Sequence, residues 1–221
     1  NSMTTAYIVD AVRSPVGKRG GSLAGIHSAD LGAHALSALL DRVKVDPGAI
    51  DDVIFGCTDS IGSQAGNIAR TAWLVAGGAE HLPGVTIDRQ CGSSQQAVHF
   101  AAQAVMSGTQ DLVIAGGVQN MSAIPISAAM MLGEQFGFST PFAESPGWRA
   151  RFGDQEVSQF RASQMIADHW ELSRDDMEEF AFESHQRAIV ATDEGRFDRE
   201  IAPIAGLSHD EGPRRDTTRE K

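Results

Sequence analysis

The sequence predicts an α/β protein in which helices flank a mostly parallel, mixed sheet. Short apolar runs alternate with helix-length segments over the first 120 residues, and this order is typical of parallel strands, which need a helical crossover between them. With 221 residues and 42% hydrophobic content, the chain can bury the core of one large domain or two small ones.

The elements of this α/β region follow from periodicity and from their end signals. The expected strands are 6–12, 53–57, 85–87 and 112–115. The expected helices are 28–43, 67–75 and a long one that begins next to Cys91 and closes at 107–108. Each helix carries apolar side chains on one face, and Gly108 fits a helix C-terminus. The Gly-rich loop 13–22 matches neither common phosphate-binding pattern, so no phosphate site is expected there.

The character of the chain changes after Asn120. Residues 121–151 are rich in Met, Pro, Gly and Phe and lack a clear period, which indicates an extended excursion. Helices are expected at 155–170 and 174–193, the second capped by Ser173, followed by a short strand at 201–204. We therefore predict one domain at 4–120 and a second, incomplete one at 121–221.

Cys91 is the first candidate for chemistry. It lies between an expected strand and an expected helix, where free N–H groups and the helix dipole stabilise a thiolate. Its neighbours Gly92, Ser93 and Ser94 are small, so a substrate carbonyl could approach the sulfur. A single cysteine is also often a small buried hydrophobe, and position alone leaves both readings open.

Composition limits the partners and the compartment. The formal net charge of −11 argues against nucleic acid, which is bound by basic residues. No apolar run reaches transmembrane length, so no membrane insertion is expected. Cys57 and Cys91 form neither a disulfide framework nor a zinc pattern, which favours a reducing, cytoplasmic location. We expect Cys57 to be a packed core thiol.

Other catalytic and metal sites find no support in the sequence. No GxSxG motif occurs, and the scattered histidines match no metal-ligand spacing, so no metal is expected. His99 lies about 12 Å from Cys91 along a helix axis, too far for a general base. Any base for Cys91 must come from elsewhere.

Five blocks in order give the sequence a resemblance to the thiolase family. The blocks are 11–17 with 20–23, 64–70, 88–94, 116–122 and 194–203. The resemblance implies a thiolase-like layered fold and acyl transfer between CoA thioesters. Cys91 would carry the acyl group as a thioester, with its backbone N–H in an oxyanion hole. It implies coenzyme A thioesters as substrates and no permanently bound cofactor.

The same resemblance assigns 121–221 to a helical loop domain and suggests a homodimer or homotetramer. In it, Ser158 and Gln159 would border the CoA and substrate pocket. The block around Cys91 looks especially like actinobacterial thiolases of sterol or fatty-acid degradation. Asp88 and the stretch 159–164 depart from the common family pattern, which suggests a changed acyl preference for a bulky substrate.

Thiolases also have a second half that supplies the activating His, a second Cys and an Asn-Glu-Ala-Phe segment, and this half is absent from the chain. We therefore expect the 221 residues alone to be inactive. Two alternatives stay open from the sequence. One is a condensing enzyme of the ketoacyl-synthase or HMG-CoA-synthase type, and the other is a non-catalytic assembly module that keeps the fold.

Overall fold

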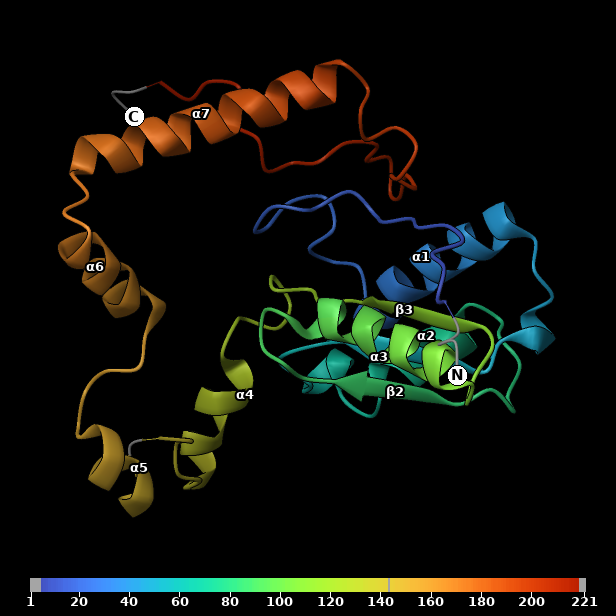
Figure 1. The fold of residues 1–221 in the computed structure, drawn as a ribbon, viewed down its shortest axis with the longest axis horizontal. Coiled ribbons are helices and arrows are strands. Elements are labelled where there is room, and N and C mark those ends of the chain that lie inside the picture. Colours follow the sequence, from blue (N-terminus) through green and yellow to red (C-terminus); the bar gives the residue numbers. More distant parts are fainter. Residues whose placement is uncertain (1–4, 143, 219–221) are drawn as a thin grey trace. The chain divides into compact units, whose positions relative to one another are not determined.

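A computed structural model describes residues 5–142 and 144–218 of the chain (Figure 1). The chain forms two compact units. Unit 1 comprises residues 1–129 and 199–211, and unit 2 comprises 130–198 and 212–221. Each unit is described by itself. The predicted domain division at 120/121 stays a prediction.

Unit 1 contains a three-stranded parallel sheet of order β2-β1-β3. Its strands are β1 (Asp52–Gly56), β2 (Gly84–Ile87) and β3 (Val113–Gly117). Val53 of β1 lies opposite Gly84 of β2 and Ile114 of β3. The prediction of a parallel α/β arrangement is therefore confirmed.

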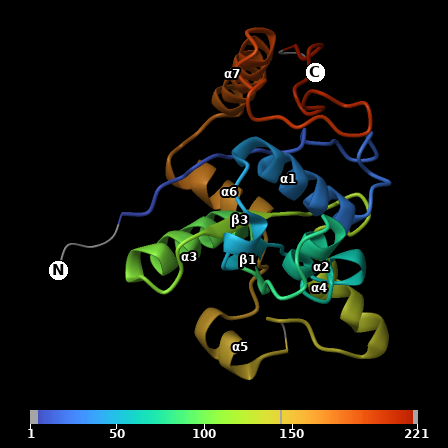
Figure 2. The ribbon, with the colours of Figure 1, turned by 90° about the vertical axis from the view of Figure 1, so that its right-hand side faces the viewer.

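Three helices cover the two faces of this sheet, and two short 3-10 turns lie in the connections between these helices and β1. The helices are α1 (Ser28–Val43), α2 (Ile68–Val75) and α3 (Ser93–Ser107), and the turns are η1 (Pro47–Ala49) and η2 (Gly62–Gln64). Alternate residues of β1 point to opposite faces, so Val53 and Phe55 pack with α1 and α2, whereas Ile54 packs with α3. Figure 2 shows α3 on one side of the strands and α2 on the other.

Trp73 is the largest fully buried side chain of the core formed by α1, α2 and the sheet. Its Nε1–H donates a hydrogen bond to the carbonyl of Ala79 at 3.0 Å. Gly78 makes room for the indole, because a Cβ there would lie 2.0 Å from Trp73 Cε2. The turn after α2 therefore requires glycine at this position.

Two expected strands are wrong. Residues 6–12 form no strand, and Tyr7, Ile8 and Val9 are 81%, 81% and 70% exposed. A strand requires a hydrogen-bonded neighbour, and within the described residues the nearest strand-like pairing is a single bridge between Arg13, just after this segment, and Ile201. The expected strand 201–204 is likewise reduced to isolated bridges.

Unit 2 consists of helices and turns in the part of the chain that is described. They are η3 (Leu132–Phe136), α5 (Pro146–Phe152), α6 (Gln159–His169) and α7 (Arg174–Asp193), preceded by α4 (Ala128–Met131), which begins at the end of unit 1. The prediction of α7 is confirmed with its bounds, since Ser173 and Asp176 form a capping box. The stretch expected to be aperiodic is held locally by stacking of Trp148 between Phe142 and Phe152, with ring centroids 4.6 and 4.5 Å apart.

Candidate functional site

The candidate site lies at the carboxyl edge of the sheet in unit 1. Because β1, β2 and β3 are parallel, the loops that follow Gly56, Ile87 and Gly117 leave from the same edge. Ligands of open α/β sheets bind at this edge. The loop that follows β2 contains Cys91.

Two glycines allow the start of α3 to approach this edge. A Cβ on Gly56 would lie 2.4 Å from backbone atoms of Ser93 and Ser94, and a Cβ on Gly117 would lie 2.0 Å from Ser94 Oγ. A larger residue at Gly56 would overlap helix backbone and push the first turn of α3 away from the sheet. At Gly117 it would overlap the Ser94 hydroxyl and, at 2.6 Å, the Gly56 carbonyl oxygen.

Cys91 is exposed and lies in a tightly bonded turn ahead of α3. Ser93 Oγ donates to the carbonyl of Gln90 at 2.6 Å and accepts from Arg89 N–H at 2.9 Å. Asp88 accepts from the N–H of Gln90 at 2.7 Å, and Gln90 has the uncommon φ of 48°. The helix starts at Ser93 with Gly92 as its N-cap, so Cys91 lies between β2 and the first turn of α3, as the sequence predicts.

The other cysteine has a different environment. Cys57 is 2% exposed and packs with Ala29 and Ile68. Burial raises the pKa of its thiol above the ordinary range, a hydrogen bond with Ser60 opposes the increase, and the nearby carboxylates of Asp59 and Asp88 add to it. The prediction that Cys57 is a packed core thiol is confirmed.

The sequence analysis did not predict a buried polar cluster in the loops that follow β1 and β3. Asn120 is 6% exposed, and its Nδ2 donates to the carbonyls of Leu23, Ala24 and Ile26. Gln64 accepts from Asn120 N–H at 2.8 Å and donates to the carbonyl of Asp59 at 2.8 Å. Asp59 is itself 3% exposed. These residues lie far apart in the sequence in loops without a period, so no spacing signal indicates them.

A cavity of about 720 Å³ also lies in unit 1. Its lining includes the segment 12–19, apolar side chains of α1, and the carboxyl end of β3. Phe55 and Ile114 form part of its wall, and Cys91 does not. The exposed Cys91 thiol therefore opens to the surface rather than into this cavity.

Ser158 and Gln159, which are expected near the CoA pocket, belong to unit 2. Ser158 caps α6 by accepting from the N–H of Arg161 at 3.1 Å, and Gln159 is the exposed first residue of that helix. Their binding role stays a prediction. Within residues 5–142 and 144–218, no three His, Cys, Asp or Glu side chains group as metal ligands.

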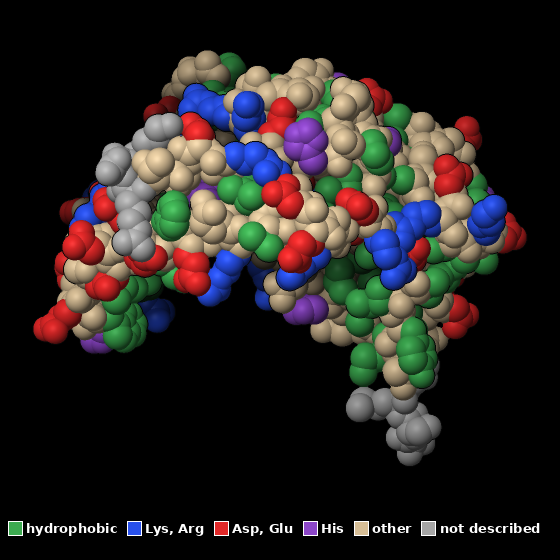
Figure 3. All heavy atoms as spheres, turned by 90° about the horizontal axis from the view of Figure 1, so that it is seen from above, with side chains coloured by type: hydrophobic (Ala, Val, Ile, Leu, Met, Phe, Trp, Pro, Cys, Tyr) green, Lys and Arg blue, Asp and Glu red, His purple; other side chains and the backbone are tan. Residues whose placement is uncertain are grey.

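Two further surface properties concern possible partners. Acidic and basic side chains are interspersed on the face drawn in Figure 3. In the described part of the chain, none of the helices combines the length and apolar character that a membrane span requires.

Comparison with known proteins decides the family. A family model described as the N-terminal domain of thiolase matches residues 6–221. The chain belongs to the thiolase family. This thiolase-family chain is 61% identical over 216 residues to the steroid 3-ketoacyl-CoA thiolase FadA6 of Mycobacterium tuberculosis. The aligned stretch covers 96% of the chain and 53% of that protein.

Two other relatives match over a comparable share of the chain at lower identity. The 3-ketoacyl-CoA thiolase of Pseudoalteromonas translucida is 40% identical over 94% of this chain and 51% of its own length. The crystal structure of the Bacillus anthracis acetyl-CoA acetyltransferase superposes with a TM-score of 0.80 at 31% identity, covering 100% of this chain and 58% of that one. The chain thus spans a little over half the length of these relatives, and the predicted thiolase-like fold is confirmed.

Proposed function

We propose that the protein of which these residues form part transfers acyl groups between CoA thioesters, with Cys91 as the acyl carrier. The observation that carries this proposal is the exposed thiol in a rigid turn at the carboxyl edge of a thiolase-fold sheet. A nucleophile held in this way can be reached by a thioester without moving its backbone.

The chemistry is a two-step exchange of thioesters. In the degradative direction, the Cys91 thiolate attacks the 3-oxo carbon of a 3-oxoacyl-CoA, the C2–C3 bond breaks, and the C2 carbanion takes up a proton and leaves as acetyl-CoA. A CoA thiolate then attacks the acyl-Cys91 carbonyl, the shortened acyl-CoA leaves, and Cys91 is released as a thiolate. We assign the Cys91 N–H to the oxyanion hole of these intermediates. The base and the second cysteine of the mechanism are expected outside these 221 residues.

The substrate class follows from the relatives and from the departures in unit 2. The name of the relative with 61% identity refers to steroid 3-ketoacyl-CoA, so we propose a 3-oxoacyl-CoA with a bulky, ring-bearing acyl group. Ser158 and Gln159 would contact it or its CoA. The proposed assembly is a homodimer or homotetramer. Both cysteines are free thiols, which supports the proposed cytoplasmic location.

The test is the covalent intermediate itself. The whole protein, including any polypeptide beyond residue 221, is incubated with acetyl-CoA and digested, and the peptides are analysed by mass spectrometry. We expect a mass increase of one acetyl group on the Cys91 peptide. Cys57→Ser should keep the adduct, because Cys57 is buried, whereas Cys91→Ser should lose it.

Label on another residue, or on none, would reject the assignment and leave a non-catalytic module with the thiolase fold. Thiolysis of a 3-oxoacyl-CoA by free CoA separates thiolases from condensing enzymes of the ketoacyl-synthase or HMG-CoA-synthase type. The relatives reported above are thiolases, so neither alternative gains support from them.

A further inference from the structure

The peptide group that joins Gln90 to Cys91 carries two polar atoms with different tasks. Its N–H is the group that the proposed function assigns to the oxyanion hole, and its carbonyl oxygen belongs to Gln90. The peptide is trans and planar, so its C=O and its N–H point in opposite directions. Whatever holds the Gln90 carbonyl therefore also sets the direction of the Cys91 N–H.

Ser93 holds this carbonyl with two hydrogen bonds. Its hydroxyl donates to the Gln90 oxygen at 2.6 Å, and its backbone N–H donates to the same oxygen at 3.1 Å. The hydroxyl oxygen also accepts from the N–H of Arg89 at 2.9 Å. Ser93 is only 5% exposed, so water does not readily replace these bonds. The carbonyl is thus directed toward the start of α3, and the Cys91 N–H points the other way.

Asp88 holds the other side of Gln90. Its Oδ1 accepts from the N–H of Gln90 at 2.7 Å, in a turn that aspartate forms with the residue two positions ahead. Gln90 has a φ of 48°. This left-handed conformation costs free energy in a residue other than glycine and persists only where its surroundings hold it. Asp88 and Ser93 supply that hold, one on each side of the residue.

We propose that Ser93 and Asp88 are positioning residues for acyl transfer, which together keep the Gln90–Cys91 peptide in the orientation that presents the Cys91 N–H to the oxyanion. This inference rests on the proposed function. Neither side chain takes part in the covalent steps, because each is engaged with the backbone of the turn. Without them the left-handed residue relaxes and the peptide rotates, which withdraws the donor from the oxyanion.

The hold on this peptide matters only in reactions that form an oxyanion. A donor that is already aimed at the position where negative charge develops lowers the barrier without reorganisation during the reaction. Acetylation of Cys91 by acetyl-CoA passes through such an oxyanion. Alkylation by iodoacetamide does not, because the sulfur displaces iodide from a CH₂ group. The ratio of the two rates therefore reports on the oxyanion donor.

The first measurement compares these two rates in Ser93→Ala, in the whole protein, by mass spectrometry of the Cys91 peptide in quenched samples. We expect acetylation to slow by at least about tenfold, toward the factor of about 10²–10³ that removal of one oxyanion donor costs. Alkylation should change by less than about threefold, because the thiol stays exposed. A change in the ionisation of the thiol would alter both rates alike and leave their ratio unchanged.

Ser107→Ala is the matched control for this variant. The Ser107 hydroxyl also donates to a backbone carbonyl, that of Ala104, at 2.8 Å, and it lies in the last turn of the same helix. Both rates should stay at their wild-type values. The comparison therefore removes the general cost of losing a serine hydroxyl from α3.

Asp88 offers a test of rescue by a conservative variant. Asp88→Asn keeps an oxygen that accepts from the Gln90 N–H, so its ratio of acetylation to alkylation should stay within about twofold of the wild-type ratio. Asp88→Ala has no acceptor, and its ratio should fall by at least about threefold. The fall should be smaller than in Ser93→Ala, because Asp88 is exposed and water partly replaces its oxygen.

Asp46→Ala is the control for the aspartate variants. Asp46 Oδ1 accepts from the N–H of Gly48 at 2.9 Å in the same kind of turn, but this turn precedes β1 rather than α3. Neither rate should change in this variant. An equal fall in Asp46→Ala and Asp88→Ala would contradict a specific role for Asp88.

The inference is overturned if the ratio stays at the wild-type value in Ser93→Ala or in Asp88→Ala. It is also overturned if acetylation and alkylation fall by the same factor, since the residues would then act on access to the thiol rather than on the oxyanion. A ratio as low in Asp88→Asn as in Asp88→Ala would assign the effect to the charge and contradict the hold. If Ser93→Ala does not fold, the Asp88 variants decide, because Asp88 is exposed.

Hydrogen exchange distinguishes this failure from a failure of the proposed function. A wild-type protein that forms no acetyl adduct on Cys91 would reject the proposed function, and the catalytic role of the two residues with it. Their hold on the turn is still measured, because amide exchange should rise by at least about threefold at Arg89 in Ser93→Ala and at Gln90 in Asp88→Ala. Unchanged exchange at both amides would show that the two side chains do not hold the turn.

Discussion

Gly56→Ala tests whether the end of β1 determines where the Cys91 turn lies. The added Cβ would be 2.4 Å from the Ser93 carbonyl carbon and from the Ser94 nitrogen, and 2.7 Å from Ser93 Cβ. Ordinary contacts of a Cβ are 3.4 to 4 Å. The neighbours are backbone atoms of α3, so no side-chain rotation can relieve the overlap, and the first turn of the helix must move by about 1 Å or more.

The expected cost follows from this overlap. Added methyl groups in packed cores cost about 1–3 kcal/mol, and an overlap with backbone belongs at the upper end of that range. With a urea m-value of about 2 kcal/mol per molar, the unfolding midpoint should fall by about 1 M. Because Cys91 precedes this turn, its alkylation rate by iodoacetamide should also change by more than about threefold.

Gly116→Ala is the matched control. Gly116 lies one strand away in β3, opposite Phe55, and its Cβ would meet only the Phe55 ring, at 3.4 Å. Its urea midpoint and its Cys91 alkylation rate should stay close to those of the wild type. If Gly56→Ala unfolds at the wild-type urea concentration and reacts at the wild-type rate, the close approach of α3 to β1 is not what places Cys91.

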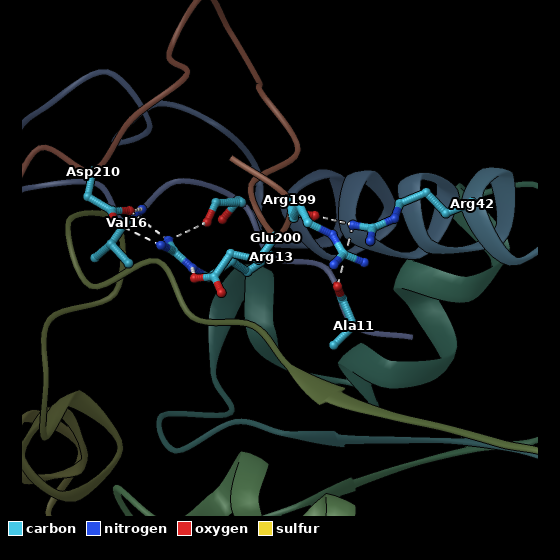
Figure 4. A network of polar contacts seen from close by, with 8 residues as sticks. Ala11, Arg13, Val16, Arg42, Arg199, Glu200 and Asp210 are labelled. Atoms are coloured by element: carbon cyan, nitrogen blue, oxygen red, sulfur yellow. Dashed lines mark hydrogen bonds and ion pairs between the residues drawn. The ribbon is translucent and has the colours of Figure 1, made fainter. Parts of the chain in front are cut away.

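Three further predictions concern stability. Trp73→Ala should lower the free energy of unfolding by about 3–5 kcal/mol, measured in urea, because it removes the largest buried side chain and its bond to Ala79. Asn120→Ala should cost about 3 kcal/mol in the same assay, because buried carbonyls lose their donor. Asp210→Asn should cost about 1.5–3 kcal/mol at pH 7. The ion pair with Arg13 (Figure 4) holds the pKa of Asp210 below its ordinary value of 3.8. The pair therefore stabilises the fold fully at pH values above 3.8 and loses this effect as the pH falls through the lowered pKa. Paired unfolding curves at pH 7 and pH 3 should therefore show the difference shrinking as the native carboxyl protonates.

Much of unit 1 is predictable because its signals are local. The strand that contains Val53 and the helix that contains Trp73 are short apolar or periodic segments bounded by glycine or asparagine, and each finds its neighbour within the chain. The end of α3 at Gly108 and the start of α7 at Ser173 are set by capping chemistry that acts over one turn. Such features need no knowledge of distant contacts.

The wrong strand at 6–12 shows where local signals stop. Tyr7, Ile8 and Val9 have high strand propensity, but propensity describes a fit to a sheet surface and supplies no neighbour. In the described residues, the strand-like pairing nearest to the segment is one bridge between Arg13 and Ile201, and Arg42 contacts Asp10 and Ala11 only through its side chain. The sequence therefore indicates what these residues favour, and the long-range pairing decides what they form.

The sequence did not indicate Asp59 for a related reason, namely that its partners are distant in the chain. Its three partners lie 60 to 70 residues away in the chain, so no motif spacing joins them. Buried carboxylates are costly unless they are fully hydrogen-bonded, and Asp59 accepts from the backbone N–H groups of Ser127 and Ala129, which form one bend, and from the Gln119 amide. A charge kept at that cost fixes the bend more firmly than an apolar side chain could, because shifting the bend leaves the charge without partners. Asp59 follows β1 and Cys91 follows β2, so the parallel sheet brings the bend that Asp59 holds to the same edge as the exposed thiol.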